Sequence, residues 1–268
     1  MVHTAFQSPQ MENSILIRDY PLQLNEITTD AGIRSYVLFN ILQDAAGRHA
    51  DLLGVGLRQL RQNNLIWVLS RIRFKMEAFP EYGDSIRITT YPSGFDRLFA
   101  YRQFRIDSAE TGKHFGTAGS AWLTLNPETL RPFPPERLLQ GNPLWNPDMP
   151  RYFQQDLGKI RPFEDQELQN PLPHRISATE IDYNNHLNNA YYGMLAEDWL
   201  GEKTGSLVRV WDIQVNFNFS GLFRDTLICS GSITGDQHFY VEGSLASNGK
   251  NAFQATGSFE IINNSVNQ

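Results

Sequence analysis

Hydrophobic residues recur at spacings of three and four in two stretches of the chain, a pattern typical of amphipathic helices. The first stretch covers residues 38–53 and is followed by Gly54, a residue type that commonly ends a helix. The second stretch is shorter, covers residues 189–200 and is followed by Gly201. We therefore predict one long helix in each half of the chain, with Gly54 and Gly201 as stop signals.

After each predicted helix the hydrophobic period changes to two, which indicates half-buried strands. Ile72, Phe74 and Met76 alternate with polar residues in the first half, and Ile213 and Val215 do so in the second. Turns that contain glycine separate further strands, because glycine supplies the positive φ of a tight hairpin. The predicted strands are residues 71–76, 85–91, 98–107 and 116–125, then 213–218, 226–233, 239–247 and 254–262.

The same order of elements, one helix followed by antiparallel strands, occurs twice, which indicates an internal duplication. Nine of the 14 prolines lie between Pro132 and Pro173. Proline disfavours helix at its own position and at the residue before it, so this stretch is predicted to be a connector with at most short helical turns. We expect an α+β fold of two related domains, residues 14–130 and 174–263, joined by a proline-rich linker at 131–173.

The composition narrows the class of protein. Hydrophobic residues make up 41% of the 268 residues, which is enough for a buried core, and the net charge of -6 argues against nucleic-acid binding. Cys229 is the single cysteine, which excludes an internal disulfide framework and a zinc site built from several thiolates. The polar start shows no secretory signal, and no stretch reaches the ~18 apolar residues of a membrane span. We expect a cytoplasmic protein.

Basic side chains form the polar face of one predicted strand, at Arg71, Arg73 and Lys75. Two interpretations stay open. Such a face is commonly the solvated side of an amphipathic strand. Alternatively, it would attract an acidic macromolecule despite the negative charge of the whole chain.

The densest group of polar residues lies just ahead of the second predicted helix and includes Asp182, Asn184, His186 and Asn188. These residues are two apart, so an extended segment would direct all four to one side. Asn188 or Asn189 is suited to cap the helix. The free N–H groups of the first helical turn would form a site for developing negative charge.

Side chains of this kind suit the hydrolysis of an activated acyl compound. Asp182 would act as general base toward water or attack as a nucleophile, while Asn184 and His186 orient the reacting groups. A thiol leaving group, with a pKa near ~8.5, departs with little help from an acid, which favours a thioester substrate. The alternative is a turn and a helix cap without catalysis. We expect no metal, because no second histidine or cysteine lies near Asp182 and His186 in the sequence.

The run Asp182-x-Asn184-x-His186-x-Asn188-Asn189-x-x-Tyr192 resembles the signature of the acyl-acyl carrier protein thioesterases. Further segments are similar to the same family: the helix from Asn40 through His49, the run from Leu65 to Arg71, Pro80-x-Tyr82-Gly83-Asp84, and Thr111-Gly112 followed by Ser120-Ala121-Trp122. The resemblance implies two tandem hot-dog domains, each a long helix wrapped by a curved antiparallel sheet. It associates the first domain with acyl-chain accommodation and the second with catalysis.

The activity that this resemblance implies is hydrolysis of acyl-acyl carrier protein thioesters to free fatty acid and carrier-protein thiol, which ends fatty-acid synthesis. The implied catalytic residues are Asp182, Asn184 and His186, with Asn188 and Asn189 at the helix N-terminus that faces the oxyanion. No cofactor is expected.

The chain departs from the family pattern just before the turn that ends in Asp225. The family usually has a glutamate there, beside a cysteine in plant members, whereas this chain has Ser220 and Gly221. A mechanism that requires a cysteine nucleophile at that place fails for this chain. Ser220 remains a candidate for polar support of water or substrate, and Cys229, eight residues beyond Gly221, is expected in the core.

The implied partner is an acidic acyl carrier protein. The candidate docking residues are Arg71, Arg73, Arg97, Arg102 and Arg105. Two alternatives stay open: a hot-dog thioesterase that acts on acyl-CoA, and a non-catalytic acyl-binding or regulatory protein that has lost turnover with the glutamate. The two domains would either pair with each other or build a homodimer of tandem chains.

Overall fold

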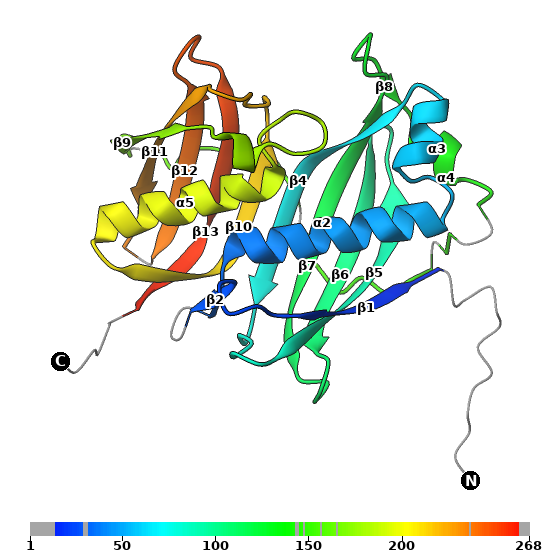
Figure 1. Cartoon of the computed structure of the whole chain (residues 1–268), viewed down its shortest axis with the longest axis horizontal. Helices are drawn as coiled ribbons and strands as arrows, with labels where there is room; N and C mark the ends of the chain where they lie inside the picture. Colours follow the sequence, from blue (N-terminus) through cyan, green and yellow to red (C-terminus); the bar gives the residue numbers. More distant parts are fainter. Residues whose placement is uncertain are drawn as a thin grey trace.

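The computed structural model describes residues 14–28, 32–142, 145–146, 148–155, 157–164, 166–235 and 237–262. Across these residues an antiparallel sheet of 11 strands carries two long helices on one face (Figure 1). Pro143 and Pro147 of the predicted linker, and position 263 of the second predicted domain, lie outside the described residues. Within the described ranges, no helix has the length and apolar character needed to cross a membrane.

The helices and strands follow the predicted order. The first half contains β1 (Leu16–Pro21), β2 (Ile27–Thr28), β3 (Gly32–Ile33), α2 (Ser35–Leu52), α3 (Leu57–Gln62), β4 (Ile66–Met76), β5 (Ser85–Phe95), β6 (Phe99–Ser108) and β7 (His114–Leu125). The connector holds β8 (Pro132–Phe133) and α4 (Glu136–Leu139). The second half contains β9 (Gln169–Arg175), the 3-10 turn η1 (Ala178–Glu180), α5 (Asn189–Thr204), β10 (Leu207–Phe217), β11 (Thr226–Ile233), β12 (His238–Leu245) and β13 (Asn251–Ile262).

The two halves join edge to edge into a single sheet. The strand order is β5-β6-β7-β4 in the first half and, mirrored across the junction, β10-β13-β12-β11 in the second. Strands β4 and β10 pair antiparallel, and Arg73 of β4 forms two hydrogen bonds of 2.8 and 2.7 Å with the carboxylate of Asp212 on β10. Equivalent strands therefore meet at this seam, which confirms the internal duplication that the element order predicts.

The two long helices differ in how well their ends were predicted. Helix α2 ends at Leu52, and Gly54 just beyond it has a φ of +71°, as its role of stop signal requires. Helix α5 continues through Gly201 and ends at Gly205, whose φ is +66° and whose N–H donates to the Gly201 carbonyl at 2.8 Å. The apolar stripe stops at Leu200, but the last, polar turn remains helical until a residue adopts the left-handed conformation.

The apolar faces of α2 and α5 lie against the sheet and share one core. Leu38 and Leu42 of α2 are fully buried, as are Trp199 and Leu200 of α5. The helices also pack on each other, because α5 carries Gly193 where a Cβ atom would lie 2.8 Å from the Phe39 ring. A glycine at this position therefore lets the two helices approach closely.

The proline-rich connector lies on the outer face of the sheet, opposite the helices. Phe153 is buried against Gly119 of β7, and the carbonyl of Gly158 accepts hydrogen bonds from Gln214 at 2.8 Å and Asn216 at 3.1 Å on β10. The connector thus contacts strands on both sides of the β4–β10 junction. Its last residues belong to β9, which pairs with β11, so the sequence prediction of at most short helical turns is wrong at this end.

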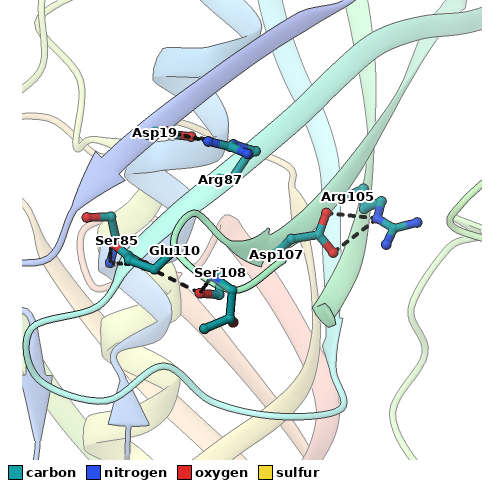
Figure 2. A network of polar contacts seen from close by, with 8 residues as sticks. Asp19, Ser85, Arg87, Arg105, Asp107, Ser108 and Glu110 are labelled. Carbon is teal, nitrogen blue, oxygen red and sulfur yellow. Dashed lines mark hydrogen bonds and ion pairs between the residues drawn. The ribbon is translucent and has the colours of Figure 1, made fainter. Parts of the chain in front are cut away.

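The outer edge of the first half is closed by β1, a strand that the hydrophobic pattern does not predict. Asp19 of β1 lies directly opposite Arg87 of β5, and their side chains form hydrogen bonds of 2.7 and 2.8 Å (Figure 2). Because β1 exposes most of its side chains, it lacks the alternation by which a half-buried strand is recognised.

Candidate active site

The segment from Asp182 to Asn188 is a tight turn and not an extended strand. Ile181 and Leu187 form an antiparallel bridge at its base, and the Asp182 N–H donates to the His186 carbonyl at 2.8 Å. Asn185 at the tip has a φ of +62°, a left-handed conformation that asparagine tolerates. The expectation that Asp182, Asn184, His186 and Asn188 share one side through a period of two is therefore wrong. The turn brings them together in another way.

The carboxylate of Asp182 organises this turn. Its Oδ1 accepts hydrogen bonds from the backbone N–H groups of Asn184, at 2.8 Å, and His186, at 3.2 Å. These bonds fix the carboxylate relative to the loop. Within the described part of the chain its Oδ2 has no hydrogen-bond partner, nor do the side chains of Asn184 and His186, which are exposed. One short loop therefore carries an exposed amide, an exposed imidazole and a half-buried carboxylate.

Helix α5 begins directly after this turn, and Asn188 caps it. The Asn188 Oδ1 accepts from the Ala190 N–H at 3.0 Å, as the sequence predicts for either Asn188 or Asn189. The Asn188 carbonyl accepts from the Tyr191 N–H at 3.0 Å. The Asn189 N–H has no hydrogen-bond partner among the described residues, so it is a donor of the first turn that remains for an incoming negative charge.

The side chains of Asn188 and Asn189 have a second role that sequence reasoning missed. Asn188 donates to the Asn40 side chain at 3.1 Å, and Asn189 donates to the Gln43 side chain at 3.0 Å. Asn40 and Gln43 lie three apart on α2, so they occupy one face of it. This polar pair within an apolar helical pattern is the signal that could have found the contact.

The loop between β10 and β11 lies beside the turn. The Gly221 carbonyl accepts from the Leu187 N–H at 2.9 Å, and the Gly221 N–H donates to the Tyr192 hydroxyl at 3.1 Å. Ser220 is therefore held next to the turn, with an exposed side chain. A Cβ atom at Gly221 would lie 2.5 Å from Ile176 Cδ1, so a cysteine at this place would require the Ile176 side chain to move.

The first half reaches the turn through α3, a helix that was not predicted. Arg61 of α3 donates to the Tyr183 hydroxyl at 2.7 Å, and its guanidinium lies 4.6 Å from the centre of the Tyr183 ring. The candidate site is thus bordered by both halves of the chain. Neither residue has a period or motif that would have indicated this contact.

The five arginines that were predicted to dock a carrier protein differ in their surroundings. Arg71 donates to the Leu157 carbonyl of the connector and lies over the Phe99 ring, and Arg73 is occupied by Asp212 at the seam. Arg97 is exposed in the β5–β6 turn.

The last two docking candidates are also engaged. Arg102 is only 8% exposed, contacts His49 Nδ1 at 2.9 Å, and burial lowers the pKa of its guanidinium to about 9. Arg102 therefore cannot reach a docking protein, and that prediction is wrong. Arg105 is paired with Asp107 at 2.8 and 3.0 Å (Figure 2).

Cys229 lies in β11 and is buried. Burial raises the pKa of its thiol to about 12, so it does not form a thiolate near neutral pH. This agrees with the predicted core position. Within the described residues, no three His, Cys, Asp or Glu side chains gather as a metal site would require.

The fold is that of tandem hot-dog domains, and solved structures show the same architecture. An acyl-ACP (acyl carrier protein) thioesterase from Bacteroides thetaiotaomicron matches with a TM-score of 0.80 and 24% identity over 93% of this chain and 99% of that one. The 12:0-ACP thioesterase from Umbellularia californica also has a TM-score of 0.80, with 16% identity over 92% and 98% of the two chains.

Sequence comparison finds similar proteins of one kind. Residues 14–136 match the family described as the acyl-ACP thioesterase N-terminal domain. The chloroplastic palmitoyl-acyl carrier protein thioesterase of Gossypium hirsutum is 26% identical over 187 residues, 66% of this chain and 45% of its own length. The chloroplastic oleoyl-acyl carrier protein thioesterase 2 of Arabidopsis thaliana is 25% identical over 193 residues, 68% and 51% of the two chains. The first half of the chain is thus similar to the N-terminal domain of acyl-ACP thioesterases, and the chain spans about half the length of these curated relatives.

Proposed function

We propose that this protein hydrolyses acyl-ACP thioesters to free fatty acid and carrier-protein thiol, with Asp182 as the central catalytic group. The observation that carries the proposal is the turn ahead of α5, where backbone N–H groups fix one oxygen of Asp182 and leave the other without a hydrogen-bond partner among the described residues. Relatives named palmitoyl- and oleoyl-acyl carrier protein thioesterases support the choice of substrate.

In this proposal the fixed Asp182 carboxylate activates a water molecule or attacks the thioester carbonyl itself. Asn184 and His186 orient the water or the carbonyl from the same turn. The N–H of Asn189, at the positive end of α5, stabilises the oxyanion. The C–S bond then breaks and the thiolate leaves, because its pKa near ~8.5 makes it a good leaving group. When Asp182 acts as base, the proton that it took from water passes to the thiolate. When Asp182 attacks as nucleophile, the thiolate takes its proton from a second water molecule, whose hydroxide hydrolyses the acyl-Asp182 anhydride and releases the fatty acid.

Ser220 occupies the place where the family pattern has a glutamate, so the proposed mechanism assigns no acid or base to it. Its hydroxyl lies on the loop that is bonded to Leu187, where it would hold water or substrate by hydrogen bonds. Asn188 positions the site by capping α5 and binding Asn40.

The domain roles follow the same proposal. Residues 174–263 form the catalytic domain, residues 14–130 accommodate the acyl chain, and residues 131–173 connect them, although β9 at the end of this connector pairs with β11 of the second half. A cytoplasmic location stays a prediction, since the plant relatives are named chloroplastic. A homodimer also stays a prediction.

The test is a panel of thioesters with one acyl group on three carriers: acyl carrier protein, coenzyme A and pantetheine. Release of free thiol is the measured quantity. We expect the largest kcat/KM with the carrier protein. Equal or faster thiol release from the coenzyme A thioester would show that acyl-CoA, and not acyl-ACP, is the preferred substrate. Tight binding of all three thioesters without thiol release would identify a non-catalytic acyl-binding protein.

A further inference from the structure

Three exposed aromatic rings lie around the candidate active site, and each has a cation over its face. Arg61 lies 4.6 Å from the centre of the Tyr183 ring, Arg224 lies 5.0 Å from that of Phe223, and Lys250 lies 4.4 Å from that of Phe219. The three rings are between 44% and 69% exposed. We call these six residues the basic-aromatic rim.

The rim is continuous with the turn that holds Asp182. Tyr183 is part of that turn, and Phe223 follows Gly221, which is bonded to Leu187. The Phe219 N–H donates to the Ala252 carbonyl at 3.0 Å, which places Phe219 beside the β12–β13 turn that carries Lys250. Helix α3 and the β12–β13 turn lie at the same end of the sheet, the top of the view in Figure 1.

The charge of the rim runs against that of the whole chain, which is -6. Helix α3, which supplies Arg61, has two arginines and no acidic residue. Two carboxylates near the rim accept hydrogen bonds from backbone N–H groups: Asp182 inside its turn, and Asp225 from Leu222 at 2.9 Å. A cation over an exposed ring keeps its outer side available for a carboxylate, while the ring edge offers apolar contact.

A surface of this kind fits a partner that combines acidic side chains with exposed apolar ones. We propose that the basic-aromatic rim is the docking surface for the acidic carrier protein that delivers the acyl thioester. This inference rests on the proposed function and deepens it. It replaces Arg71, Arg73, Arg102 and Arg105 as docking residues, because those side chains are buried or already engaged.

The position of the rim also explains how the substrate would enter. A carrier protein bound there lies at the mouth of the Asp182 turn, so its thioester reaches the carboxylate without crossing the molecule. Complementary charge chiefly raises the rate of association, and salt weakens this effect. The rim should therefore affect the carrier-protein substrate and not a small thioester.

The test compares a rim variant, Arg61→Gln/Arg224→Gln/Lys250→Gln, with a matched control, Arg18→Gln/Lys113→Gln/Arg137→Gln. The control removes the same charge from three cations that cover other rings, those of Tyr20, Phe115 and Phe133. The measured quantity is the ratio of kcat/KM for acyl-ACP to kcat/KM for the same acyl group on pantetheine. This ratio corrects for any change that the loss of Arg61 causes in the catalytic turn.

We expect the ratio to fall by about tenfold or more in the rim variant and by less than about twofold in the control. A double variant, Arg224→Gln/Lys250→Gln, keeps the Arg61–Tyr183 contact and should lose an intermediate factor. An unchanged ratio in the rim variant, or an equal loss in the control, would overturn the proposal that the rim docks the carrier protein. The proposed hydrolase activity would not be affected by either result.

Binding separates the docking surface from the proposed activity. If the wild-type protein releases no thiol from any thioester, the proposed function fails. Labelled acyl-ACP is then titrated against the same variants and followed by fluorescence anisotropy. Binding that weakens in the rim variant alone supports the docking surface, and binding that is equal in all variants overturns it.

Discussion

Glu197 of α5 accepts two hydrogen bonds from Ser35, the first residue of α2, with distances of 3.0 Å from its N–H and 2.6 Å from its hydroxyl. A carboxylate from the second half thus accepts a hydrogen bond from a backbone N–H at the start of α2, a group that has no partner within its own helix. Both residues are buried. The pair fixes the N-terminal end of α2 against the middle of α5.

Replacing Glu197 should therefore destabilise the fold. Glu197→Ala leaves the two Ser35 donors unpaired in the core, at a cost of about 1–3 kcal/mol in the free energy of unfolding. Urea unfolding measures this cost. Glu202→Ala, an exposed glutamate on the same helix, is the control and should change stability by less than about 0.5 kcal/mol. Equal effects of the two variants would contradict the role of Glu197.

The pH dependence of stability gives a separate prediction for Glu197→Gln. Burial raises the pKa of the Glu197 carboxyl above its ordinary value. The folded state therefore keeps this proton to a higher pH than the unfolded state does. Protonation of Glu197 stabilises the fold fully at a pH below the ordinary pKa of glutamate. That effect is lost as the pH rises through the raised value. Glutamine accepts the same hydrogen bonds without titrating, so the variant should gain stability relative to wild type over this interval. Parallel pH profiles of the two proteins would contradict the prediction.

Asp182→Asn tests the proposed catalytic carboxylate. Asparagine keeps the Oδ1 acceptor that closes the turn, so the fold should be unchanged while kcat/KM falls by roughly 10²–10⁴-fold. Asp96→Asn is a matched control, because Asp96 Oδ1 accepts from the Leu98 and Phe99 N–H groups in a similar turn of the first half. Thiol release by Asp96→Asn should stay close to wild type. Near-normal turnover by Asp182→Asn would show that another group carries the reaction.

The contact between Asn189 and Gln43 should couple the two helices. A double-mutant cycle with Asn189→Ala and Gln43→Ala is expected to give an interaction energy of about 0.5–1.5 kcal/mol, the usual value for one hydrogen bond. Chemical denaturation of the four proteins gives this number. Strict additivity would mean that the 3.0 Å bond contributes nothing to the packing of the halves.

Cys229 should be inert in the native protein. With the pKa of its thiol raised to about 12 by burial, an aromatic disulfide reagent should titrate no thiol until urea unfolds the chain. Cys229→Ala should keep kcat/KM for acyl thioesters within about twofold of wild type, because the thiol takes no part in the proposed chemistry. Rapid labelling of the folded protein at pH 7 would contradict its buried position.

The sequence predicts the fold well where one face of an element is buried. The alternation around Ile72 and Ile213 and the helical stripe through Leu42 match β4, β10 and α2, since burial of one face imposes a period. It fails at β9, where Pro171 and Pro173 lie in a strand that is at the edge of the sheet among the described residues, a place that tolerates proline. It also fails at Gly201, which remains inside α5.

The candidate site was predicted less completely than the fold. The residues of the turn were found because they are polar and close together in the sequence, but their arrangement depends on the left-handed Asn185, which no hydrophobic period indicates. Arg61, Asn40 and Gln43 come from more than 100 positions away. Such contacts follow from the pairing of the two halves, which a local pattern does not specify.

The seam between β4 and β10 has one further consequence. In an assembly of two identical subunits, every substitution appears twice and both copies of a site must tolerate it. Here Arg73 and Asp212 meet across the same kind of junction, but each half is encoded once. A substitution in the first half is therefore not repeated at the equivalent place of the second, so away from the contacts of Arg61, Asn40 and Gln43 the two halves are free to diverge.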